Sequence, residues 1–248
     1  MSSTPAHHIH HLIIQPADAA LSPPESYFFI QDGLIITCGI LYAFCYIFYM
    51  IRTYSDRTYP LASVQGIHFM SLTLAYELYY AVVITTTTFE LLGFLVWFLL
   101  DVGFVAVALW RVHEKRNRWG IVRRMVGFVV AAMGLLRGLA MVWPDEREQI
   151  TAYWTGILLQ VPISWVCLWT LWKGQSTKGH SLEIWLMRYL GCYAAYAVFF
   201  WRYWNVPQNW SYVASVWSVA VIAWTLLLET VYPFVYIWVY QTSKVKGE

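Results

Sequence analysis

Residues 91–110 read LLGFLVWFLLDVGFVAVALW, an apolar run of twenty residues with one charged side chain, Asp101, near its middle. An α-helix of that length rises about 30 Å, which matches the hydrocarbon thickness of a bilayer. The whole chain of 248 residues has the same character, since 59% of it is hydrophobic, 19% is aromatic and only 12% is charged. A water-soluble domain carries about 25% charged residues. The sequence therefore predicts an integral membrane protein.

Seven apolar segments of this kind follow one another along the chain, separated by short polar breaks. They lie at residues 33–51, 61–86, 90–111, 121–143, 150–173, 182–204 and 212–240. Seven spanning helices of about twenty residues each leave little chain for a further domain. The sequence predicts an all-α, polytopic bundle of seven transmembrane helices over residues 33–240. A flexible luminal tail is expected at 1–32 and a cytoplasmic tail at 241–248.

Positive charge predicts the orientation of this bundle, because cytoplasmic loops carry an excess of Lys and Arg. Twelve of the sixteen basic residues fall in alternate breaks and in the C-terminal tail, on one predicted side. We therefore expect the N-terminus in the lumen or exterior and the C-terminus in the cytoplasm. The tail Lys244-Val245-Lys246-Gly247-Glu248 resembles a dilysine retrieval signal, which points to the endoplasmic reticulum.

Five ionisable side chains lie well inside the predicted helices, where each is costly and is therefore a functional candidate. They are Glu77, Asp101, Arg137, Arg188 and Glu229. Asp101 and the two arginines are expected to form a supporting polar network. Because there are three acids and two bases, one acid is left without a permanent partner. A carboxyl of that kind in a dry site stays protonated at neutral pH, as a general acid must.

Glu77 and Glu229 both lie near the middle of the bilayer if a helix rises about 1.5 Å per residue, so they can face one cavity. Pro233 follows Glu229 by four residues and lacks the N–H that would bond to the Glu229 carbonyl. That carbonyl is therefore expected to be free beside the carboxyl. Aromatic residues in mid-helix positions are candidates for the cavity lining: Tyr76, Tyr80, Tyr193, Tyr196, Trp224 and Tyr232.

Other kinds of chemistry lack the residues that they need. All five lysines lie in predicted loops or the tail, so a retinal Schiff base inside the bundle is excluded. The four cysteines lie in apolar segments, and the cluster His7, His8, His10 and His11 is interpreted as part of the flexible tail. We expect no metal site and no cofactor. The net charge of +2 is too small to indicate a nucleic-acid partner.

Buried carboxyls in an aromatic-rich, apolar cavity suit one type of reaction. A protonated carboxyl can deliver a proton to an epoxide oxygen or an alkene, and a second carboxylate can steer the cation or remove the final proton. A cavity without water protects the resulting carbocation, and the faces of aromatic rings stabilise it.

Several stretches resemble motifs of the fungal membrane-bound terpene cyclases, which make meroterpenoids and indole diterpenes. They are residues 74–80 around Glu77, 97–102 around Asp101, 181–188, 199–203, and 229–236. The resemblance spans about residues 50–240, and the stretch at 229–236 is the most specific. It implies that Glu77 and Glu229 are the two essential acids. Members of the family often carry Asp at the second position.

By this resemblance the chain is an enzyme that opens the epoxide of a farnesyl-type chain on an aromatic or polyketide head group and closes rings. Glu77 is then the proton donor, and Glu229 orients that proton or stabilises and quenches the cation. The expected partners are this hydrophobic substrate and membrane lipid, with the oligomeric state left open. The alternative is a small seven-helix, proton-coupled transporter in which the buried acids relay protons.

Overall fold

The computed structural model of the chain describes residues 11–60, 62, 64–85 and 88–245, apart from the side chains of residues 64–68 and 245. Nine α-helices account for most of this part: α1 (Pro16–Ala20), α2 (Glu25–Asp56), α3 (Val64–Tyr79), α4 (Thr88–Arg111), α5 (Lys115–Val142), α6 (Gln149–Gly174), α7 (Leu182–Asn205), α8 (Pro207–Trp210) and α9 (Val216–Val245). A π-helical turn at Tyr80–Ile84 extends α3. Two 3-10 turns, Glu146–Glu148 and Ser211–Ala214, lead into α6 and α9. The described residues contain no strand, so the all-α prediction is confirmed.

The helix count among the described residues is nine rather than the predicted seven, because α1 and α8 are short helices that lie outside the apolar segments. Each predicted segment coincides with one of the longer helices. Five of these, α2, α4, α5, α6 and α9, are long and apolar enough to cross a membrane. The apolar part of α3 and its π turn is shorter, and α7 carries several polar and charged side chains. The seven-span topology and its orientation therefore stay predictions.

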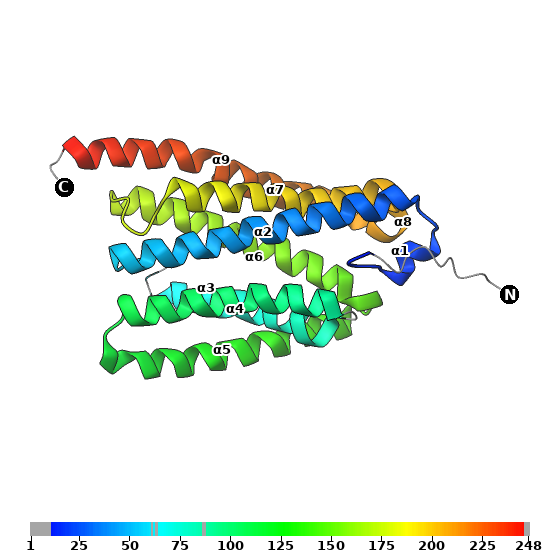
Figure 1. Cartoon of the computed structure of the whole chain (residues 1–248), viewed down its shortest axis with the longest axis horizontal. Coiled ribbons are helices and arrows are strands. Elements are labelled where there is room, and N and C mark those ends of the chain that lie inside the picture. Colours follow the sequence, from blue (N-terminus) through cyan, green and yellow to red (C-terminus); the bar gives the residue numbers. More distant parts are fainter. Residues whose placement is uncertain (1–10, 61, 63, 86–87, 246–248) are drawn as a thin grey trace.

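The longer helices run side by side along the long axis of the molecule (Figure 1). Helix α2 packs against α7 and α4, and α3 packs against α4 and α5. Helix α9 packs against α6 and α7. Helices α1 and α8 lie at one end of the bundle, and the last turns of α9 lie at the opposite end (Figure 1).

The described part of the predicted flexible tail is folded. Residues 16–20 form α1, and α2 begins at Glu25 rather than at the predicted residue 33. Asp18 is buried and accepts hydrogen bonds from the Tyr27 hydroxyl and the Asn209 amide, both at 2.8 Å, and from the Trp210 indole at 3.1 Å. Composition could not reveal this order, because Asn209 and Trp210 lie at the far end of the chain. His7, His8 and His10 lie outside the described residues.

Candidate active site

Glu229, on α9, is fully buried and forms an ion pair with Arg188 of α7. The Nε and Nη2 atoms of Arg188 donate to the two carboxylate oxygens at 2.8 and 2.9 Å. Ser164 of α6 donates to Oε1 of the same carboxylate at 2.6 Å. Two parallel, charge-assisted bonds with a guanidinium stabilise the ionised form of a carboxyl. The Arg188–Glu229 pair is therefore a fixed carboxylate and its counter-ion.

Two neighbouring side chains hold this ion pair in place. Nη1 of Arg188 donates to the hydroxyl oxygen of Tyr49, on α2, at 2.7 Å. The main-chain carbonyl of Glu229, which Pro233 leaves without its helical partner, accepts the indole N–H of Trp185 at 2.7 Å. The carbonyl is therefore used by a side chain of α7, so the residue is held through both its carboxylate and its backbone.

Glu77, on α3, lies in a different environment, since no basic side chain among the described residues contacts it. Its Oε1 accepts the hydroxyl of Tyr46 at 2.8 Å, whereas its Oε2 is buried and has no hydrogen-bond partner among the residues that the structure describes. Asp101, on α4, is also buried and lies close enough for the two carboxyls to interact electrostatically. Oδ2 of Asp101 accepts the hydroxyl of Thr73 at 2.8 Å. We call Glu77 and Asp101 the acid pair.

The predicted polar network of Asp101 with the two arginines is not what the structure contains. Nη1 of Arg137 donates to Glu148 at 2.7 Å, and the Arg137 side chain is 58% exposed. Arg188 is bonded to Glu229. Two acids, not one, therefore lack a basic partner within the described part of the chain. Glu148 lies in the 3-10 turn before α6. Helix periodicity in the sequence cannot predict which side chain such a turn places next to Arg137.

Helix α2 connects the ion pair to the acid pair. Tyr46 and Tyr49 are three residues apart, so their side chains lie on the same face of α2. One hydroxyl donates to Glu77 and the other accepts from Arg188. These two tyrosines and Ser164 are not among the site residues that the sequence predicts. The one feature of the sequence that could have indicated them is a side-chain hydroxyl at a helical spacing within an otherwise apolar segment.

The aromatic candidates separate into inward and outward groups. Tyr80, Tyr196 and Tyr232 are buried, and the ring of Tyr76 lies 4.7 Å from that of Tyr80. Tyr193 and Trp224 lie on outer surfaces, with exposed fractions of 47% and 48%. They were chosen by their depth along a helix, which does not determine the direction in which a side chain points. These two residues therefore do not line the interior.

Comparison with known proteins shows which family this chain belongs to. The family described as Pyr4-like transmembrane terpene cyclases matches residues 17–242. The chain belongs to this family. It is 29% identical over 230 residues to the Pyr4-family terpene cyclase mfmH of Annulohypoxylon moriforme, covering 91% of this chain and 93% of the relative. It is 25% identical over 220 residues to the terpene cyclase macJ of Penicillium terrestre, covering 87% and 84%. No solved structure matches the chain.

Membership in the Pyr4-like cyclases confirms the resemblance that the motifs around Glu77 and Glu229 carry. The chain is a membrane enzyme that cyclises terpenoids, and its substrate is hydrophobic. The family does not favour the transporter interpretation. The buried carboxyls thus belong to a cyclase, although the family match by itself assigns no role to either of them.

Loss of one partner of the ion pair should destabilise this cyclase more than loss of both charges. In Arg188→Met, the carboxylate of Glu229 stays buried without its counter-ion, and we expect the free energy of unfolding to fall by about 3 kcal/mol. In Arg188→Met/Glu229→Gln, no uncompensated charge remains, and most of this loss should be recovered. Denaturant unfolding in detergent measures both values. A single variant as stable as the wild type would contradict the account.

His180 should make the stability of the protein depend on pH. It lies in the loop before α7, its Nδ1 is 3.0 Å from the Tyr232 hydroxyl oxygen, and burial lowers its pKa to about 3. In the unfolded chain the pKa of histidine is about 6.5, so the unfolded state alone gains a proton between these values. Stability should therefore fall as pH drops from about 6.5 towards 3.

His180→Asn should show a weaker fall, measured as the unfolding midpoint at several pH values in this range. Equal pH dependence in the variant and the wild type would show that His180 is not buried in its neutral form.

Proposed function

We propose that this cyclase starts its reaction by proton transfer from Glu77 to the epoxide of a farnesyl-type chain carried on an aromatic or polyketide head group. The observation that carries the proposal is the acid pair, two buried carboxyls without a basic partner among the described residues. The epoxide and the head group come from the family resemblance. Proton transfer as the first step comes from the arrangement of the carboxyls.

The acid pair favours a bound proton. Two buried carboxyls that interact with each other resist double ionisation, so the pair favours holding a proton. Tyr46 occupies Oε1 of Glu77 as a hydrogen-bond donor, and within the described part of the chain Oε2 has no partner. Oε2 is therefore the atom that we assign to carry the proton and deliver it to the substrate.

Glu229 has the opposite role in this proposal. A carboxylate held by two bonds to Arg188 and one to Ser164 is ionised and fixed, so it is not a proton donor. Its fixed charge can orient the acid and the developing cation without a reorganisation cost during the reaction. The extra carbon of Glu, compared with Asp, is accommodated here by the bonds from α6 and α7.

The chemical step conserves atoms and protons. The proton passes from Glu77 to the epoxide oxygen, the C–O bond at the more substituted carbon breaks, and a neighbouring double bond of the chain attacks that carbon. The cation then moves through the ring closures, next to ring faces such as those of Tyr76 and Tyr80. The final proton passes from carbon to the carboxylate that the first step left in the acid pair, which restores the acid, so the overall reaction is an isomerisation.

Two further properties belong to this proposal. The start by proton transfer is proposed to be metal-independent, because the carboxyl of Glu77 supplies the proton itself. The enzyme is proposed to reside in the endoplasmic reticulum, on the basis of the dilysine-like tail and the charge-based orientation.

Glu77→Gln tests the acid assignment, because the amide cannot donate an acidic proton while its size and hydrogen-bonding capacity are kept. We expect turnover of an epoxyfarnesyl phenol to fall by about 100-fold or more. The variant should still be present in the membrane in wild-type amounts. Product formation by isolated membranes, measured by mass spectrometry, gives the rate.

The matched control is Glu183→Gln, which removes the same group from an exposed position in the first turn of α7. It should keep the wild-type rate. Near-wild-type turnover by Glu77→Gln would show that another group supplies the proton.

A further inference from the structure

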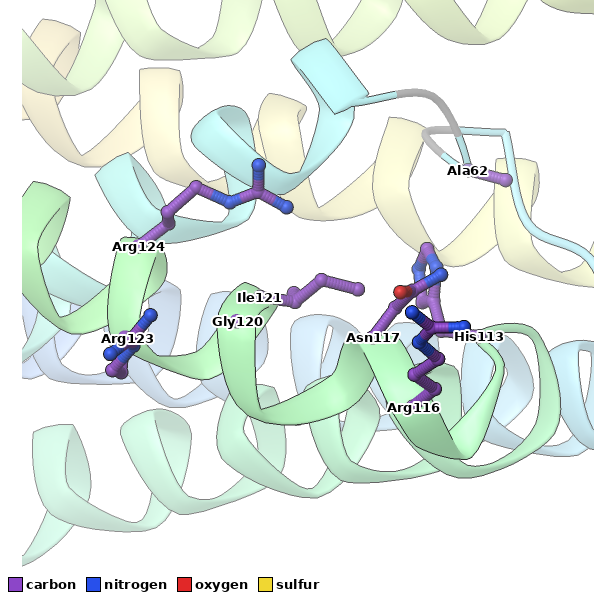
Figure 2. A pocket seen from close by; sticks show the side chains of 8 residues that line it. All are labelled: Ala62, His113, Arg116, Asn117, Gly120, Ile121, Arg123 and Arg124. Carbon is purple, nitrogen blue, oxygen red and sulfur yellow. The ribbon is translucent and has the colours of Figure 1, made fainter.

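The beginning of α5 carries a cluster of positive charge that the cyclase chemistry does not use. A hollow of about 630 Å³ is lined by this part of α5, by His113 just before it and by Ala62 (Figure 2). Its polar lining includes Arg116, Asn117, Arg123, Arg124 and His113. None of its lining residues in the described part of the chain is acidic. We call this feature the arginine hollow.

The arginines of this hollow are not used to hold the protein together. The nearby Arg118 is, since its Nη2 donates to the Trp110 carbonyl at 2.7 Å and its Nε donates to the His113 carbonyl at 3.0 Å. The side chains of Arg116, Arg123 and Arg124, in contrast, make no hydrogen bond or ion pair with another described residue. Figure 2 shows Arg124 extending over the hollow, with Arg116 at its other end. Three like charges around one space favour an anion there.

The arginine hollow lies at the level expected for lipid headgroups. Residues 125–142 of α5, in which Arg137 is the one charged residue, span about 27 Å at 1.5 Å per residue, close to the thickness of the hydrocarbon core. The arginines of the hollow precede this part and therefore lie just outside the core. Trp110 and Trp119 are 74% and 71% exposed at the same level, and exposed tryptophan is typical of the membrane–water interface.

We propose that the arginine hollow binds the headgroup of an anionic phospholipid from the leaflet that meets the start of α5. The planar guanidinium pairs with phosphate oxygens through two parallel bonds, which suits it to a phosphate at this position. The acyl chains can continue along α5, where Val126 and Val130 are 58% and 65% exposed. A soluble phosphate or diphosphate shares the chemistry of the headgroup but lacks this apolar contact.

Binding is measured on the purified full-length protein, reconstituted in phosphatidylcholine nanodiscs with or without phosphatidic acid. Native mass spectrometry after release from the nanodisc counts the retained phosphatidic acid. The wild type should retain it in preference to phosphatidylcholine. Arg116→Gln/Arg124→Gln should weaken this retention by about tenfold or more, since each basic residue near the surface contributes to the attraction of anionic lipid.

The matched control is Lys173→Gln/Lys178→Gln, which removes the same charge at the same end of the bundle but outside the hollow. It should retain phosphatidic acid like the wild type. Equal loss of lipid in both double variants would overturn the proposal, because the effect would then be one of overall charge.

Further measurements separate guanidinium pairing from charge alone, and a lipid headgroup from a soluble anion. Arg116→Lys/Arg124→Lys keeps the charge but loses the paired hydrogen bonds of guanidinium, and an intermediate retention would support the proposal. Cyclisation by the variants in phosphatidylcholine reports whether each is folded. If inorganic diphosphate in solution displaces phosphatidic acid at equal concentration, the hollow is a site for a soluble anion, and the lipid proposal is wrong.

Discussion

A carboxyl inside a bilayer must be paired with a basic group or neutralised by a proton, and the interior of this cyclase contains one carboxyl with a basic partner and two without one among the described residues. Arg188 and Glu229 are paired through two short bonds and are supported by Ser164 and Tyr49. Glu77 and Asp101 have only hydroxyl groups as hydrogen-bond partners within the described residues, and each of these carboxyls adds to the cost of ionising the other. One carboxyl site is therefore suited to hold charge and the other to hold a proton.

These two sites are joined through helix α2, which has no acidic residue of its own at this depth. Tyr46 and Tyr49 lie on one face of α2 and contact the two sites separately. Because α2 packs against both α4 and α7, it relates the position of the acid pair, which contains the proposed proton donor, to that of the Arg188–Glu229 ion pair. An enzyme that guides a carbocation needs such a fixed relation, because its cation has no permanent bond to the protein.

Hydropathy predicted the long helices, because twenty apolar residues have few alternatives to a spanning helix. The cost of buried charge also identified Glu77, Asp101 and Glu229 before any contact was known. The partners could not be predicted in the same way. A rise of 1.5 Å per residue gives the height of Arg137 or Tyr193 but not its direction, and both turned out to point outward. The order of α1 depends on contacts of Asp18 with residues near the other end of the chain.

We propose that this chain alone closes rings by proton transfer from its buried carboxyls. The test is to supply an epoxyfarnesyl phenol to membranes in which this chain is the only cyclase and to measure the cyclised product with and without the chelator EDTA. If proton transfer from the carboxyls starts the reaction, a cyclised isomer of the substrate should form at the same rate in both conditions. No cyclised product, or a loss of product in EDTA that added Mg²⁺ restores, would contradict it.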